Sequence, residues 1–149
     1  MKRGWIPPRS PYSLLQEDLW SSAPESEWLI LVACMMLNCT TRKQVERILP
    51  EFRRRWPTPQ AFAASSEDEV RELIRPLGFA NRRTVALKKM TAAYLAGDWK
   101  HASELPGVGA YAASAHDVFC RGEVPLEPPN DHALRQYVVW YNKQFRSKK

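Results

Sequence analysis

Residues 104–113 read ELPGVGAYAA, and residues 105–110 within them predict a tight turn that leads directly into a helix. Gly107 and Gly109 have no Cβ, so both are able to take positive φ and let another backbone approach closely. Amide N–H groups of the turn and of the helix start then point outward and can hold a phosphate, helped by the helix dipole. The alternative is an ordinary glycine C-cap before a new helix. The preceding Leu-Pro and the small residues that follow favour a hairpin between two closely packed helices.

The composition indicates one small domain with a basic surface. The chain has 149 residues, of which 44% are hydrophobic and 26% are charged, enough for a single core. A net charge of +6 favours a polyanionic partner, nucleic acid before a membrane surface. Cys34, Cys39 and Cys120 are too few and too widely spaced for a disulfide framework or a zinc site. No apolar run follows the basic N-terminus, so no signal peptide is predicted. We expect an intracellular protein, in cytoplasm or nucleoid if prokaryotic and in the nucleus if eukaryotic, and a monomer.

The hydrophobic spacing predicts an all-α fold, a single domain over residues 1–149 with an extended segment at 1–10 and a basic tail at 146–149. Residues 28–37 are apolar on every side, which is typical of a helix through the core. Ser13, Thr41 and Ser66 are expected to cap helices, and Gly97 to end one. The last helix begins at residue 130 or 131. The inward-facing side chains are expected to be Val85, Met90 and Tyr94 in one helix and Leu134, Tyr137, Val138, Tyr141 and Phe145 in the last.

The turn and the chain after it resemble the helix-hairpin-helix DNA glycosylases. The hallmark of that superfamily is this hairpin, followed by a Gly/Pro-rich loop and a catalytic aspartate. Here residues 124–129 match the loop, and Asp131 matches the aspartate. Five stretches in order also resemble the branch of methyl-CpG-binding mismatch thymine glycosylases; they are residues 7–17, 37–41, 75–79, 98–111 and 130–137. The resemblance therefore covers nearly the whole chain.

The resemblance assigns the chemistry to Asp131 and Tyr111. Such enzymes rotate the target nucleotide out of the duplex, and a carboxylate then stabilises the positive charge that develops on the sugar or orients the attacking water. The alternative for Asp131 is a simple helix cap, a role compatible with catalysis. Bifunctional members carry a lysine where this chain has Tyr111, and a phenol is a poor substitute for the amine that forms a Schiff base. The alternative for Tyr111 is core packing.

The activity implied is thus monofunctional hydrolysis of thymine or uracil mispaired with guanine in double-stranded DNA. Gln16, Leu37 and Asn38 are expected to line the base pocket, where an amide satisfies the edge of a pyrimidine. Phe79 is expected to be a wedge beside the unpaired partner base, with core packing as the alternative. The other residues expected to contact DNA are Leu105, Gly107, Val108, Gly109, Ala110, Cys39, Arg42 and His132.

Cys39 is where the chain departs from the resembling branch. It occupies the place of a longer polar or basic side chain that fills the gap left by the flipped base, and Arg42 is the nearby candidate to replace it. The basic residues expected to add non-specific phosphate contacts, or to form a solvated surface, are Arg53, Arg54, Arg55, Arg82, Arg83, Lys88 and Lys89.

Two other functions stay open from the sequence alone. One is a glycosylase for an oxidised or alkylated base; the other is a catalytically silent DNA-binding module, which needs neither Asp131 nor Gln16. The expected hydrolysis requires no metal or other cofactor, although the hairpin carbonyls offer a place for a monovalent cation. No four-cysteine cluster follows the last helix, so no iron–sulfur cluster is expected.

Overall fold

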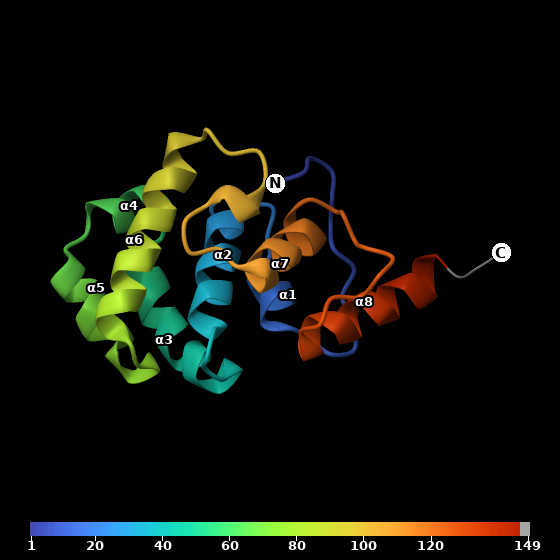
Figure 1. Ribbon diagram of the computed structural model, residues 1–149, viewed down its shortest axis with the longest axis horizontal. Coiled ribbons are helices and arrows are strands. Elements are labelled where there is room, and N and C mark those ends of the chain that lie inside the picture. The colour runs from blue at the N-terminus through green and yellow to red at the C-terminus, as the bar shows by residue number, and fades with distance from the viewer. Residues whose placement is uncertain (147–149) are drawn as a thin grey trace.

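The computed structural model describes residues 1–146, and all regular elements among them are helices, as predicted (Figure 1). The expected basic tail lies, from residue 147 on, outside the described residues. The α-helices are α1 Leu15–Leu19, α2 Glu25–Leu37, α3 Arg42–Arg55, α4 Pro59–Ala64, α5 Glu67–Ile74, α6 Ala80–Ala96, α7 Ala110–Cys120 and α8 His132–Phe145. Two short 3₁₀ helices, η1 Arg75–Leu77 and η2 Ala102–Glu104, precede α6 and the glycine turn.

Helix α2 runs through the middle of the molecule, as its apolar sequence predicts. It packs against α1 and α7 on one side and against α3 and α6 on the other (Figure 1). Trp28 is 1% exposed, its ring contacts Phe52 and Phe62, and its indole N–H donates to Thr91 Oγ1 at 3.0 Å. The donor of this large buried side chain is therefore satisfied, as packing an indole into a core requires.

The helix boundaries confirm most of the sequence-based caps. The Thr41 and Ser66 side chains accept the amides of Gln44 and Glu69, at 3.2 and 3.1 Å, and Gly97 ends α6 with φ of 75°. Ser13 is not a cap. It has φ of 47°, and α1 begins only at Leu15.

The buried Glu17 carboxylate explains why the cap at Ser13 was wrong. It accepts the amides of Ser10 and Leu14, at 2.7 and 2.8 Å, and the Ser10 hydroxyl at 2.7 Å. Glu17 thus binds the amide of Leu14, the residue before α1, and the helix begins after Leu14 and not after Ser13. The Tyr137 hydroxyl also donates to the Pro8 carbonyl at 2.6 Å, so the extended N-terminal segment is tied to α8.

Two predicted core positions are exposed. Val85 is 39% exposed because it lies on the face of α6 that borders the glycine turn, and Phe145 is 54% exposed at the end of α8, where its ring contacts Trp140 and Tyr141. Met90 is fully buried and Tyr94 is partly buried, as expected. Helical spacing identifies which residues share a face, but not how far the covering layer extends.

Near the N-terminal end of α2, the buried carboxylate of Glu27 joins α2 to α6 and α7. Glu27 Oε1 accepts the Tyr94 hydroxyl and Oε2 accepts His116 Nε2–H, both at 2.8 Å. Burial alone would raise the pKa of Glu27, but the hydrogen bonds from His116 and Tyr94 hold that pKa at about 2. The ionised form is therefore stabilised by the folded structure.

Acid should weaken the fold through Glu27. Its folded pKa of about 2 lies below the ordinary glutamate value, so its contribution to stability is present above about pH 4.5 and is lost as the pH falls towards 2. Glu27→Gln should lower the free energy of unfolding by about 2 kcal/mol at pH 7. Urea denaturation at pH 7 and pH 3 measures both effects. A variant with the same loss of stability between these pH values as the wild type would contradict this role.

Candidate active site

A cavity of about 460 Å³ opens where α1, the end of α2 and the starts of α7 and α8 meet. It brings together most of the residues expected to act on a base. The predicted residues in its wall are Gln16, Leu37, Asn38, Cys39, Arg42, Tyr111 and Asp131. These come from four separate segments of the chain, so the fold gathers them into one site.

Gln16 and Tyr111 form a buried polar pair in the wall of this cavity. Gln16 is 2% exposed, and its Nε2 donates to the Tyr111 hydroxyl oxygen at 2.5 Å and to Cys34 Sγ at 3.3 Å. Its carbonyl oxygen Oε1 accepts no hydrogen bond from the described residues. The cavity therefore offers an unoccupied acceptor whose orientation is set by two neighbours.

This part of the cavity is electrically neutral. Burial raises the pKa of the Cys34 thiol to about 12, and burial likewise raises the pKa of the Tyr111 phenol. Both groups therefore stay protonated at neutral pH. Nothing in the sequence predicts the place of Cys34 in the site, because a cysteine inside an apolar run gives no signal of a polar contact with Gln16, which comes from a different helix.

Asp131 is the N-cap of α8 and also lines the cavity. Its Oδ2 accepts the Leu134 amide at 3.0 Å, and its Oδ1 accepts no hydrogen bond within residues 1–146. One oxygen of the carboxylate thus fixes the side chain, while the other is available to a ligand. Asp131 and Arg42 are the only cavity-wall residues that carry a charge at neutral pH.

Arg42 is held in the wall of the cavity by its own contacts. Its guanidinium donates to the Ser13 carbonyl and pairs with Asp18 at 2.7 Å and with Glu46 at 3.4 Å. Its guanidinium would have to leave these contacts to fill the gap expected at Cys39, so this role of Arg42 stays a prediction.

The glycine turn has one left-handed residue, Gly107, with φ of 77°. Gly109 was expected to share this conformation, but its φ is −85° because it is the extended N-cap of α7. Leu105 and Val108 are buried, and their amides donate to the carbonyls of Ala102 and Leu105 within the turn. Among the described residues, the amides of Gly107, Gly109 and Ala110 have no acceptor. The amides of Tyr111 and Ala112, in the first turn of α7, likewise have none, so the hypothesis of a phosphate grip rests on these five N–H groups.

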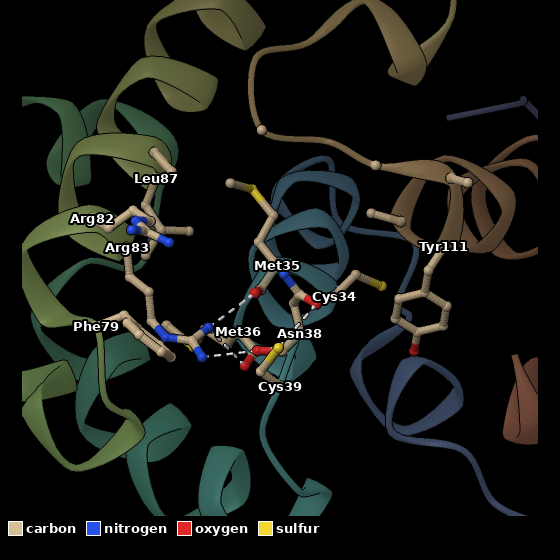
Figure 2. A pocket seen from close by; sticks show the side chains of 15 residues that line it. Cys34, Met35, Met36, Asn38, Cys39, Phe79, Arg82, Arg83, Leu87 and Tyr111 are labelled. Carbon is tan, nitrogen blue, oxygen red and sulfur yellow. Dashed lines mark hydrogen bonds between the residues drawn. The ribbon is translucent and has the colours of Figure 1, made fainter.

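A groove of about 500 Å³ lies on the other side of the α2 C-terminus, between α6 and the glycine turn (Figure 2). It shares Asn38, Cys39 and Tyr111 with the first cavity. Phe79 is 65% exposed at its edge, with the guanidinium of Arg82 5.6 Å from the ring centre. Core packing is thus excluded for Phe79.

The remaining predicted contacts divide into engaged and exposed groups. His132 is the exposed first residue of α8 and lines neither space. Lys88 caps α4 through the carbonyls of Phe62 and Ser65, and both Arg54 and Arg55 pair with Glu51. Among the basic residues expected to contact phosphate, Arg53, Arg82 and Lys89 are exposed and make no ion pair within residues 1–146.

Two further properties concern the described part of the chain. No helix in it is long and apolar enough to cross a membrane. No three or more His, Cys, Asp or Glu side chains gather there in a way that would hold a metal ion.

A small helical fold with a glycine hairpin at a helix start, beside a cavity that carries an aspartate, defines the helix-hairpin-helix class of DNA repair proteins. Residues 32–142 match the family described as HhH-GPD superfamily base excision DNA repair protein, and the chain belongs to this superfamily.

Similar proteins include several thymine-DNA glycosylases. The chain is 38% identical over 133 residues to a methyl-CpG-binding domain protein 4-like protein of Arabidopsis thaliana, covering 89% of this chain and 29% of that protein. It is 48% identical over 94 residues to the thymine-DNA glycosylase of Aeropyrum pernix, covering 58% and 42%. The chain thus spans less than half the length of either relative.

Two solved structures share the fold. A thermostable thymine-DNA glycosylase superposes with a TM-score of 0.61 at 23% identity, over 66% of this chain and 48% of that one. A trapped covalent intermediate of endonuclease III with DNA superposes with a TM-score of 0.58 at 17% identity, over 78% and 65%.

The two glycines of the turn should differ in their tolerance of a side chain. At Gly107, alanine would be left-handed and its Cβ would lie 2.9 Å from Met35 Cε, whereas at Gly109 a Cβ meets nothing within 4 Å. Gly107→Ala should lower the free energy of unfolding by about 1–2 kcal/mol, and Gly109→Ala by about 0.5 kcal/mol or less. Urea denaturation of both variants compares them. Equal losses would contradict the different backbone roles.

Proposed function

We propose that the chain is a monofunctional DNA glycosylase that removes thymine or uracil mispaired with guanine from double-stranded DNA. The observation that carries the proposal is the single cavity that holds Gln16, Tyr111 and Asp131 together. The similarity to thymine-DNA glycosylases supports the same substrate class. The protein is proposed to act as a monomer on duplex DNA.

The free acceptor of Gln16 favours thymine and uracil over cytosine. Both bases carry an N3–H donor between two carbonyl oxygens, whereas cytosine has an acceptor at N3. Gln16 Oε1 therefore complements N3–H, while Nε2 is engaged by Tyr111 and Cys34. A base without that donor would leave a buried acceptor unpaired, which costs binding energy.

Asp131 supplies the negative charge that the reaction needs. Cleavage of the N-glycosidic bond develops positive charge on the sugar, and a carboxylate at the cavity edge stabilises this charge and orients the attacking water. Its Oδ2 stays on the Leu134 amide, so the helix start keeps the side chain in place throughout. Preorganisation of this kind avoids a rearrangement during the reaction.

The cavity favours hydrolysis over amine-based lyase chemistry. Schiff-base formation needs a neutral amine near the sugar, and no lysine is among the cavity-wall residues of the described chain. Tyr111 occupies the corresponding position, and burial raises the pKa of its phenol, so it stays a neutral hydrogen-bonding group. The expected product is an intact strand with an abasic site.

Asp131→Asn should abolish base release while largely preserving DNA binding. Asparagine still caps a helix, so α8 should keep its start, but the negative charge is lost. We expect the single-turnover rate on a G·U duplex to fall by about 10²–10⁴-fold. Binding to a duplex with an abasic analogue opposite guanine should change by less than about threefold. Asp68→Asn, on the remote helix α5, is the matched control.

The same assay separates the competing functions. A panel of duplexes with G·T, G·U, G·A and oxidised bases identifies the lesion. Full activity of Asp131→Asn would overturn the assignment of the carboxylate. Tight binding without base release from any duplex would favour the silent module.

Borohydride should not trap the wild-type protein on its substrate, and the strand should break only after alkali. Tyr111→Lys places an amine in the cavity and should produce a borohydride-trapped adduct, detected by denaturing gel electrophoresis. Tyr111→Phe serves as the control without an amine. An adduct with the wild type would show that another nucleophile attacks the sugar.

A further inference from the structure

Arg83, in the first turns of α6, joins α6 to the end of α2 (Figure 2). Its Nε donates to the Gly78 carbonyl and its Nη2 to the Asn38 carbonyl, both at 2.8 Å. Its Nη1 donates to the carbonyls of Met35 and Met36, both at 3.3 Å. A single guanidinium thus satisfies carbonyls at the C-terminus of α2 and also holds the turn before α6.

Two of these carbonyls, those of Gly78 and Asn38, belong to residues that precede a left-handed, non-glycine residue. Cys39 follows Asn38 and has φ of 62°, and Phe79 follows Gly78 and has φ of 51°. Non-glycine residues keep this conformation only where the surrounding structure holds them. Arg83 is the side chain that contacts the backbone next to both.

Cys39 and Phe79 are both exposed and border the same groove. Figure 2 shows the Arg83 guanidinium between them, with its hydrogen bonds directed to the backbone of the α2 end. The spacing of the two residues therefore depends on a planar group with several fixed donors. Lysine, with one ammonium, does not reproduce that geometry.

The Arg83 guanidinium is partly buried, and burial lowers its pKa. A guanidinium withdrawn from water is stable only when hydrogen bonds replace the lost solvent. All three of its nitrogens donate to backbone carbonyls, so the structure gives Arg83 a role in holding the backbone. Its expected role as a phosphate contact stays a prediction.

We propose that Arg83 is a positioning residue that holds Phe79 and Cys39 at a fixed separation. It thereby determines how the protein accommodates the unpaired base opposite the flipped nucleotide. This rests on the proposed function. A flipped base leaves a gap in the duplex and an unpaired partner, and both must be accommodated by the residues that border the groove. A duplex that lacks the partner base keeps the gap but has no unpaired base to accommodate.

Lys88 provides a matched control on the same helix. Its ammonium donates to the Phe62 carbonyl at 2.6 Å and to Ser65 Oγ at 2.8 Å, at the C-terminus of α4. It is, like Arg83, a partly buried cation of α6 that caps another helix, but it lines neither the cavity nor the groove. Loss of Lys88 therefore affects stability without affecting Phe79 or Cys39.

The test compares Arg83→Met and Lys88→Met on two duplexes. One has uracil opposite guanine, and the other has uracil opposite a tetrahydrofuran nucleotide, which has no base. For Arg83→Met, the single-turnover rate should fall by about 100-fold on the first duplex and by less than about threefold on the second. For Lys88→Met, the ratio of the two rates should match that of the wild type.

Equal losses on both duplexes, or the same change of ratio in Lys88→Met, would overturn the proposal and leave Arg83 a purely structural role. If thermal denaturation shows that Arg83→Met is unfolded, Arg83→Lys, which keeps the charge, replaces it in the test. For Arg83→Lys the ratio of the rates on the two duplexes should change in the same direction but by less, and an unchanged ratio would overturn the proposal.

The proposed function has its own outcome in this experiment. If the wild type releases uracil from neither duplex, the glycosylase assignment fails. The role of Arg83 is then measured by binding alone, with a duplex carrying an abasic analogue opposite guanine and one carrying it opposite tetrahydrofuran. Arg83→Met should weaken binding to the first more than to the second, and equal weakening would overturn the positioning role.

Discussion

Helix α2 carries apolar side chains around its whole circumference, so other helices must cover it on every side. One side is covered by α1 and α7 and the other by α3 and α6. The covering layer ends where α2 ends, and the backbone carbonyls of that last turn still need donors. The base cavity and the groove both open at this point and share Asn38, Cys39 and Tyr111. Covering one hydrophobic helix therefore determines where the site lies.

The site combines a neutral interior with a carboxylate at its edge. Gln16, Tyr111 and Cys34 form a polar group whose members stay uncharged at neutral pH, which keeps the cost of burying them low. Asp131 stands apart at the edge, where one oxygen caps α8 and the other faces no donor of the described chain. Asp131 can therefore be both the N-cap of α8 and the proposed catalytic carboxylate, because the two roles use different oxygens.

The sequence predicted local structure better than it predicted tertiary contacts. The central helix, the caps at Thr41 and Ser66 and the end of α6 at Gly97 follow from short-range patterns, and the structure confirms them. The residues gathered in the cavity were named from a family resemblance, not from spacing. The contact between Cys34 and Gln16 and the three hydrogen bonds from Arg83 to the end of α2 join segments that are distant in sequence. Neither contact leaves a pattern along the chain.

Part of the positive charge of the chain is engaged within the described structure. Arg83 and Lys88 cap other helices, Arg42 is paired beside the cavity, and the pairs of Arg54 and Arg55 with Glu51 are internal to α3. The proposed contact with the DNA backbone also uses amides at the glycine turn, which are fixed in position, unlike long flexible side chains. Fixed donors hold a phosphate in one place. The packing of α7 and α6 around α2 sets the position of these amides, and it also sets the cavity and the groove. The proposed phosphate site and the proposed reaction site therefore depend on the same helix packing.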